Sequence, residues 1–84
     1  MTWTFLGDGV PISWESIGKV PNEFIPYSQP VSFIYGNSEY KLITDSLITV
    51  YDNGHAEAGS IQIQGAITPT SGKYYGATMM WITN

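Results

Sequence analysis

The segment ITVYDNGHAEAGSIQI, residues 48–63, decides the fold class. Its Asn53-Gly54 pair lies between two runs of alternating apolar and polar residues. Asn-Gly in this setting is the strongest short-range signal for a two-residue type I′ hairpin turn. A turn centred there pairs Ile48 with Gly59 and predicts two antiparallel strands. Because side chains alternate between the faces of a strand, one face carries the aliphatic residues and is expected to be the core: Ile48, Val50, Ile61 and Ile63.

Ser71-Gly72 predicts a second hairpin on the C-terminal side of this unit. A turn there pairs Ile63 with Met80 and Ile61 with Ile82. The two hairpins then agree on which face of residues 55–68 is buried, and a slip of one residue would destroy that agreement. The expected core residues of this hairpin are Ile61, Ile63, Ile67, Met80 and Ile82.

A third hairpin is predicted at Gly36-Asn37, with Phe33 opposite Tyr40 and Val31 opposite Leu42. The polar run at residues 44–46 is then expected to turn the chain into a further strand at 47–51.

The N-terminal part adds one strand and an irregular segment. Residues 2–6 alternate Thr with Trp3 and Phe5, which predicts a strand. Residues 7–30 carry four of the five prolines and little periodicity, so we expect an irregular excursion there. Residues 13–19 could form one helical turn capped by Ser13. The chain is therefore expected to be a single β domain over 1–84, an antiparallel hairpin meander of about six strands over 2–6 and 31–83 that forms a small sandwich or barrel.

Composition excludes several classes of function. Three lysines, no arginine and seven carboxylates give a net charge of −4, which argues against a nucleic-acid backbone and an anionic membrane surface as partners. No apolar segment indicates a signal peptide or a membrane span. Without cysteine and with one histidine, His55, the chain is expected to hold no metal and no cofactor.

No catalytic motif occurs in the sequence, so the protein is not expected to be an enzyme. A nucleophilic triad would have to use His55, which lies beside the predicted turn and is expected to be a solvent-exposed turn residue. Glu57 could contact it, but a histidine and a carboxylate alone do not make an active site. The Asp52-Asn53-Gly54 run is better explained as turn chemistry than as a calcium loop.

Aromatic residues make up 14% of the chain and are the main candidates for binding. The predicted registers place Tyr51, Tyr75 and Trp81 with Met79 on the face opposite the core. Such a second apolar face would have to be covered by residues 7–30, by another sheet or by another subunit. Exposed aromatics could also stack on sugars, although most could equally be core or cross-strand pairs. The candidate binding residues are Tyr51, Tyr75, Trp81 and Trp14.

The strand–turn–strand unit ITVYDNGHAEAGSI and the C-terminal run YYGATMMWI resemble units of bacteriophage tail-fibre, baseplate and receptor-binding proteins. The resemblance covers residues 47–83. It implies a virion protein, usually trimeric, that binds host surface glycans or neighbouring virion subunits. No functional residue of such proteins can be placed on this chain, because no functional motif is matched.

These observations favour a non-enzymatic structural or adhesive protein of a phage virion, in its tail, fibre or capsid surface. Its partners would be further copies of itself, other virion subunits or a host glycan. One alternative is a free carbohydrate-binding domain that uses Trp81, Tyr75 and Trp14 as stacking platforms. Another is a small phage-encoded inhibitor that binds one host protein.

Overall fold

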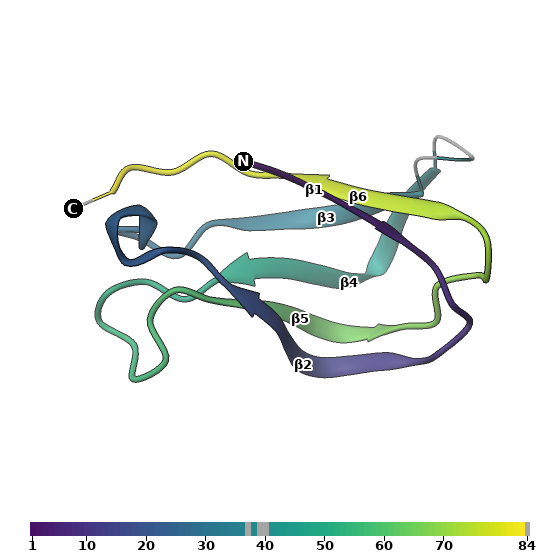
Figure 1. Ribbon diagram of the computed structural model, residues 1–84, viewed down its shortest axis with the longest axis horizontal. Coiled ribbons are helices and arrows are strands. Elements are labelled where there is room, and N and C mark those ends of the chain that lie inside the picture. Colours follow the sequence, from purple (N-terminus) through teal and green to yellow (C-terminus); the bar gives the residue numbers. More distant parts are fainter. Residues whose placement is uncertain (37, 39–40, 84) are drawn as a thin grey trace.

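The protein is described by a computed structural model that covers residues 1–36, 38 and 41–83. Six strands form one sheet, and within these residues there is no α-helix, only a short 3₁₀ helix at Asn22–Phe24. No helix of the described chain is long and apolar enough to cross a membrane. The strands are β1 (Thr2–Leu6), β2 (Ile12–Lys19), β3 (Val31–Gly36), β4 (Lys41–Val50), β5 (Ser60–Ile67) and β6 (Tyr74–Thr78), as shown in Figure 1.

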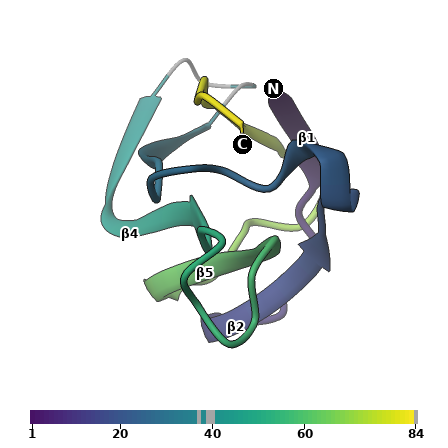
Figure 2. The same cartoon turned by 90° about the vertical axis from the view of Figure 1, so that its left-hand side faces the viewer.

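The sheet is antiparallel throughout, with the strand order β1-β6-β3-β4-β5-β2. Its two edges, β1 and β2, are consecutive in the chain and are joined by residues 7–11 alone. Five residues reach only about 20 Å, so the sheet curls until its edges approach each other. Figure 2 shows this half-barrel end-on, with the segment after β2 crossing its open end. The prediction of an all-β protein of about six antiparallel strands that forms a small sandwich or barrel is confirmed, with the sheet curled into a half-barrel.

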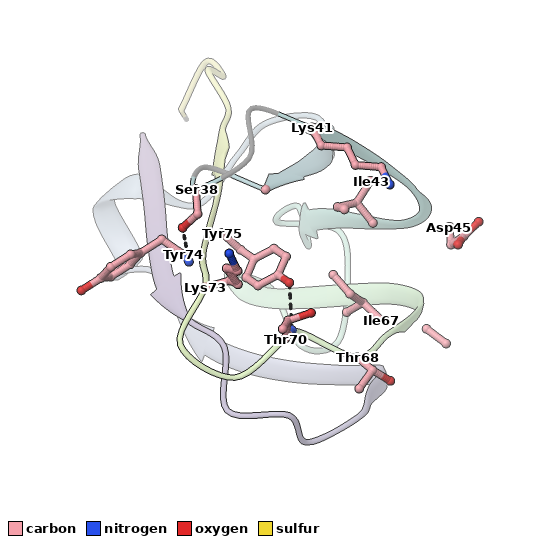
Figure 3. Close-up of a pocket in the computed structure, with 12 residues that line it drawn as sticks. Ser38, Lys41, Ile43, Asp45, Ile67, Thr68, Thr70, Lys73, Tyr74 and Tyr75 are labelled. Carbon is pink, nitrogen blue, oxygen red and sulfur yellow. Dashed lines mark hydrogen bonds between the residues drawn. The ribbon is translucent and has the colours of Figure 1, made fainter.

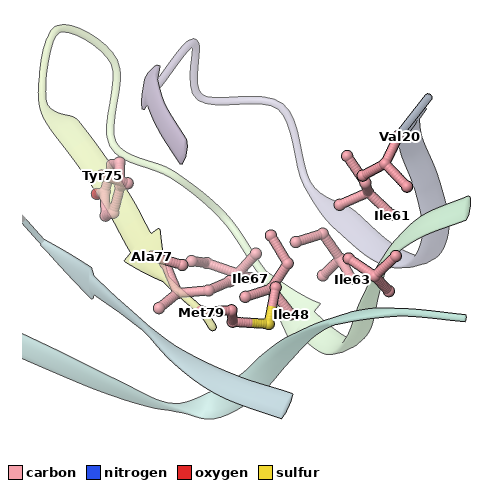
Figure 4. Packing of buried hydrophobic residues seen from close by; sticks show 10 residues of the cluster. Val20, Ile48, Ile61, Ile63, Ile67, Tyr75, Ala77 and Met79 are labelled. Atoms are coloured by element: carbon pink, nitrogen blue, oxygen red, sulfur yellow. The ribbon is translucent and has the colours of Figure 1, made fainter. Parts of the chain in front are cut away.

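The core lies inside the curl, where aliphatic side chains of β4 and β5 meet residues of β6 (Figure 4). The predicted core face of Ile48, Val50, Ile61 and Ile63 is confirmed, since each of these side chains is buried. Ile67 is also buried, as predicted. The other buried apolar residues of the cluster are Val20, Ile34, Tyr75, Ala77 and Met79.

The hairpin of residues 48–63 has the predicted faces but not the predicted register. Ile48 pairs with Ile63 rather than with Gly59, four residues further along β5. A loop over 51–59 replaces the two-residue turn, and the residue at positive φ is Gly59 rather than Asn53 or Gly54. Asp52 Oδ1 instead accepts a hydrogen bond from the Gly54 N–H at 3.0 Å. A register shift by an even number of residues leaves each side chain on the same face of the sheet. The predicted core face is therefore correct although the predicted register is not.

The hairpin predicted at Ser71-Gly72 is wrong. The chain does turn there, with Gly72 at φ +81 and the Lys73 N–H bonded to the Thr70 carbonyl. However, β6 pairs with β1 and β3, and β5 pairs with β4 and β2. Met80 and Ile82 are therefore not core residues: their side chains are 88% and 81% exposed. Tyr75 and Met79, predicted on the opposite face, are buried in the core.

The hairpin predicted at Gly36-Asn37 exists as the antiparallel pair of β3 and β4, but the register of this pair differs from the prediction. Tyr35 pairs with Leu42, and Val31 pairs with Thr49 instead of Leu42. Asn37 and Tyr40, which the prediction used, lie outside the described residues. The predicted turn at 44–46 is a bulge within β4, because Ile34 pairs with Ile43 whereas Phe33 already pairs with Leu47.

The prediction of an irregular segment over residues 7–30 is wrong in part, because this segment contains β2. The helical turn predicted at 13–19 is also wrong, since these residues belong to that strand. The prolines lie outside it: Pro11 precedes β2 and Pro21 follows it. Pro therefore brackets this edge strand without interrupting its hydrogen bonds to β5.

Candidate functional site

The four predicted binding residues lie in separate surroundings. Tyr75 is 8% exposed, stacks on Phe5 with ring centroids 5.5 Å apart, and accepts a hydrogen bond from the Thr70 N–H at 2.8 Å. Trp81 is partly buried and stacks on Trp3 at 6.1 Å. Its Nε1–H donates to the Phe24 carbonyl at 2.8 Å. Tyr75 and Trp81 therefore stabilise the fold, and they do not form a common binding surface with Trp14.

Tyr51 belongs to the loop over 51–59, where its ring stacks on His55 with centroids 3.8 Å apart. His55 is exposed, as predicted. Its Nδ1 accepts a hydrogen bond from the backbone N–H of Glu57 at 3.1 Å, so Glu57 contacts it through the main chain. These contacts organise the loop. Within the described residues, no three His, Cys, Asp or Glu side chains gather where they could hold a metal ion.

A polar pocket of about 300 Å³ lies beside the β5–β6 connection and is lined in part by Lys41, Lys73 and Asp45 (Figure 3). The Tyr75 hydroxyl in this pocket is bonded to the connection through Thr70, and Ser38 Oγ accepts a hydrogen bond from the Tyr74 N–H at 2.8 Å. These polar groups fasten β6 to its neighbours.

A second groove, of about 310 Å³, crosses the outer face of the sheet. Phe33 pairs with Leu47, and Leu47 pairs with Gln64, which makes one row across β3, β4 and β5. Trp14 is the single residue of β2 between the pairs Ser13–Ala66 and Glu15–Ile63, where β5 has two residues, Gln64 and Gly65. It therefore lies opposite a bulge of β5 and extends this row. We call this site the Trp14 groove. It is lined by Trp14, Phe33, Thr44, Asp45, Ser46, Leu47, Gln64 and Gly65.

Backbone irregularities of three strands meet at the Trp14 groove. The bulge of β4 at residues 44–46 forms one wall, and Gly65 of β5 has φ +93. A Cβ atom on Gly65 would lie 2.6 Å from the Asp45 carbonyl oxygen, so the close approach of β4 and β5 requires glycine. Trp14 itself has φ +48, and it is the non-glycine residue at positive φ in the described chain. Bulges and left-handed residues concentrate at functional sites, where they redirect side chains.

Trp14 is the predicted binding residue that the structure leaves most available, with 69% of its surface exposed. The sequence reasoning missed its companions Phe33, Asp45 and Gln64. The alternation of side chains along a strand could by itself have placed Phe33 and Leu47 on the outer face of the sheet, because their neighbours Ile34 and Ile48 face the core. The contact of these residues with Trp14 in one groove depends on strand β2. The sequence did not predict this strand, because the prolines of residues 7–30 indicated an irregular segment.

Comparison of the chain with family models, with curated proteins and with solved structures gave no match.

Proposed function

We propose that the protein is a non-enzymatic binding module that works within an assembly, as a structural or adhesive component of a phage particle. The observation that carries this proposal is the C-terminal segment after β6. It is fixed to the body by a hydrogen bond from the Tyr27 N–H to the Ile82 carbonyl at 2.8 Å and by a bridge between Pro26 and Thr83. Yet Met80 and Ile82 on this fixed segment are almost fully exposed.

Exposed apolar side chains on fixed backbone favour contact with a partner. Burying a side chain of this size contributes about 1.5–3 kcal/mol, and alternate residues of an extended segment project to the same side. Met80 and Ile82 thus supply two neighbouring apolar contacts for another subunit. Large exposed apolar patches mark such interfaces.

The open edges of the sheet support the same proposal. β1 and β2 each have one unpaired side, and unpaired strand edges can bond to another chain. Between them lies an apolar cleft of about 360 Å³ whose lining includes Phe5, Leu6 and Ile17. Leu6 and Ile17 are both exposed. An assembly would cover these edges, as protomers of virion proteins cover one another.

Sedimentation of the purified chain across micromolar concentrations tests the proposal. We expect an oligomer, and we expect the double variant Met80→Ser, Ile82→Ser to raise the dissociation constant at least tenfold. Val10→Ser removes an apolar side chain that is also exposed but lies in the β1–β2 connection, and it should leave assembly unchanged. A wild-type chain that stays monomeric at these concentrations, or a double variant that assembles normally, would contradict the proposal.

A free carbohydrate-binding domain is the second candidate. The observation that favours it is the exposed Trp14 in a groove with polar walls.

A further inference from the structure

Trp14 combines a ring that gains little from folding with a backbone conformation that raises the free energy of the folded protein. Its indole, the largest apolar side chain type, is mostly exposed, and its backbone is in the left-handed region, which costs an L-residue about 1–2 kcal/mol. In the described chain its ring stacks on no other aromatic ring and its Nε1–H has no hydrogen-bond partner. Trp3 and Trp81, in contrast, stack on each other. Within the described residues, neither ring stacking nor a hydrogen bond of the indole accounts for this conformation.

The groove supplies a second aromatic surface on the same face of the sheet. Phe33 is 45% exposed and lies in the row that ends at Trp14. Leu47, half-buried between them on β4, forms the floor. The site therefore presents ring surfaces over a supported apolar floor, on strands rather than on a mobile loop.

Polar side chains at the rim have free hydrogen-bonding capacity. Thr44, Asp45 and Gln64 line the groove, and none of their side chains is hydrogen-bonded within the described residues. Together they offer a hydroxyl, a carboxylate and an amide, which can accept from and donate to vicinal hydroxyl groups. Few polar groups around an apolar surface are typical of ligand sites, where they set orientation.

We propose that the Trp14 groove binds a neutral pyranose sugar, with Trp14 as the stacking platform. The C–H face of a pyranose ring carries positive partial charge and packs on the negative face of an aromatic ring, while its equatorial hydroxyls reach Asp45 and Gln64. A groove of about 310 Å³ is at the lower end of ligand-site volumes and suits the end of a glycan rather than a long chain.

Charge selects the neutral sugar. Asp45 is the charged residue of the groove, whereas Lys41 and Lys73 line the neighbouring polar pocket, which shares Asp45 with the groove but not Trp14. With a net charge of −4 on the whole chain, a sialylated or uronic glycan would be repelled. This inference deepens the adhesive part of the proposed function and rests on it, since it names the ligand class of that activity.

The test is an NMR titration of the ¹⁵N-labelled protein with lactose, maltotriose and tri-N-acetylchitotriose, and with 3′-sialyllactose as the charged counterpart of lactose. Sugars are added to about 10 mM, where a site with a Kd of about 1 mM is mostly filled. We expect at least one neutral sugar to shift the Trp14 Nε1–H signal, which the spectrum of Trp14→Phe assigns. We expect 3′-sialyllactose to bind at least tenfold more weakly than lactose wherever lactose binds.

Variants separate a sugar platform from an incidental contact. Trp14→Ala should weaken binding at least tenfold, while Trp14→Phe should retain most of it, because a ring face remains. Tyr27→Ala is the matched control, since Tyr27 is 65% exposed but lies outside the groove, and it should bind as wild type. Dispersed spectra of each variant confirm that it is folded.

Absence of a shift with every neutral sugar overturns the inference, as does binding that Trp14→Ala leaves unchanged. Equal binding of lactose and 3′-sialyllactose overturns the selection of neutral sugars. Sedimentation reports separately on assembly. An oligomer that ignores sugars therefore contradicts only this inference, and a monomer that binds them contradicts only the assembly proposal.

Discussion

Two groups of aromatic residues in this protein differ in how many ring and hydrogen-bond partners the fold gives them. Phe5 of β1 stacks on Tyr75 of β6, and Trp3 of β1 stacks on Trp81 in the segment after β6. The polar atoms of Tyr75 and Trp81 are hydrogen-bonded. On the outer face of β2 and β3, Trp14 and Phe33 are exposed and stack on no ring of the described residues. The first group is explained by stability alone. The second is not, and this difference identifies the groove as the candidate site.

The largest expected effect comes from truncating one member of each group. Tyr75→Ala removes a buried ring and its hydrogen bond, and should lower the free energy of unfolding by about 3–5 kcal/mol. Trp14→Ala removes an exposed ring and should change it by less than about 0.5 kcal/mol. Urea unfolding of both variants measures the difference. Equal losses would show that Trp14 is part of the stabilising core and would remove the contrast.

The second prediction concerns the backbone that shapes the groove. Gly65→Ala places a Cβ 2.6 Å from the Asp45 carbonyl oxygen at a residue with φ +93, and should cost about 2–4 kcal/mol. Gly72→Ala is its control, because Gly72 has φ +81 but nothing within 4 Å of the new Cβ. It should cost only about 1–2 kcal/mol. Similar losses in urea unfolding would mean that β4 does not crowd Gly65.

The third prediction compares two buried serines. Ser60 Oγ accepts a hydrogen bond from Gln62 Nε2 at 2.7 Å and lies 2.9 Å from Ser16 Oγ. Ser60→Ala should therefore cost about 1–3 kcal/mol. Ser46, in the β4 bulge beneath the groove, is buried, and its Oγ has no hydrogen-bond partner among the described residues. Ser46→Ala should stabilise the protein by about 1 kcal/mol. Thermal unfolding distinguishes the two by the sign of the change in Tm, and a loss for Ser46→Ala would contradict the prediction.

The smallest expected effect isolates the backbone conformation of Trp14. Trp14→Gly and Trp14→Ala both remove the indole, but glycine adopts φ +48 without the steric cost of a Cβ. Trp14→Gly should therefore be more stable than Trp14→Ala by about 1 kcal/mol. Chemical denaturation of the pair measures this difference directly. A less stable glycine variant would show that the Trp14 backbone carries no strain.

Part of the candidate site could be predicted from the sequence. Trp14 was selected because an aromatic side chain combines apolar area with a polar tip, and it is the exposed member of the predicted set. Tyr75 and Trp81 were selected for the same reason, but they are engaged within the fold. Residue type alone does not distinguish a ring that has a partner from one that has none, since the partners Phe5 and Trp3 come from the other end of the chain.

The sequence by itself determined the all-β class and the core face of β4 and β5, because strand alternation is local and survives a register shift of four residues. Only the tertiary structure decided which strands are neighbours. β6 lies between β1 and β3, and β2 pairs with β5 at the far edge. These contacts join residues distant in the chain, and loops such as 51–59 allow several registers with the same alternation. The Trp14 groove depends on that strand order, because Trp14 and Phe33 come together only across four strands of the curled sheet.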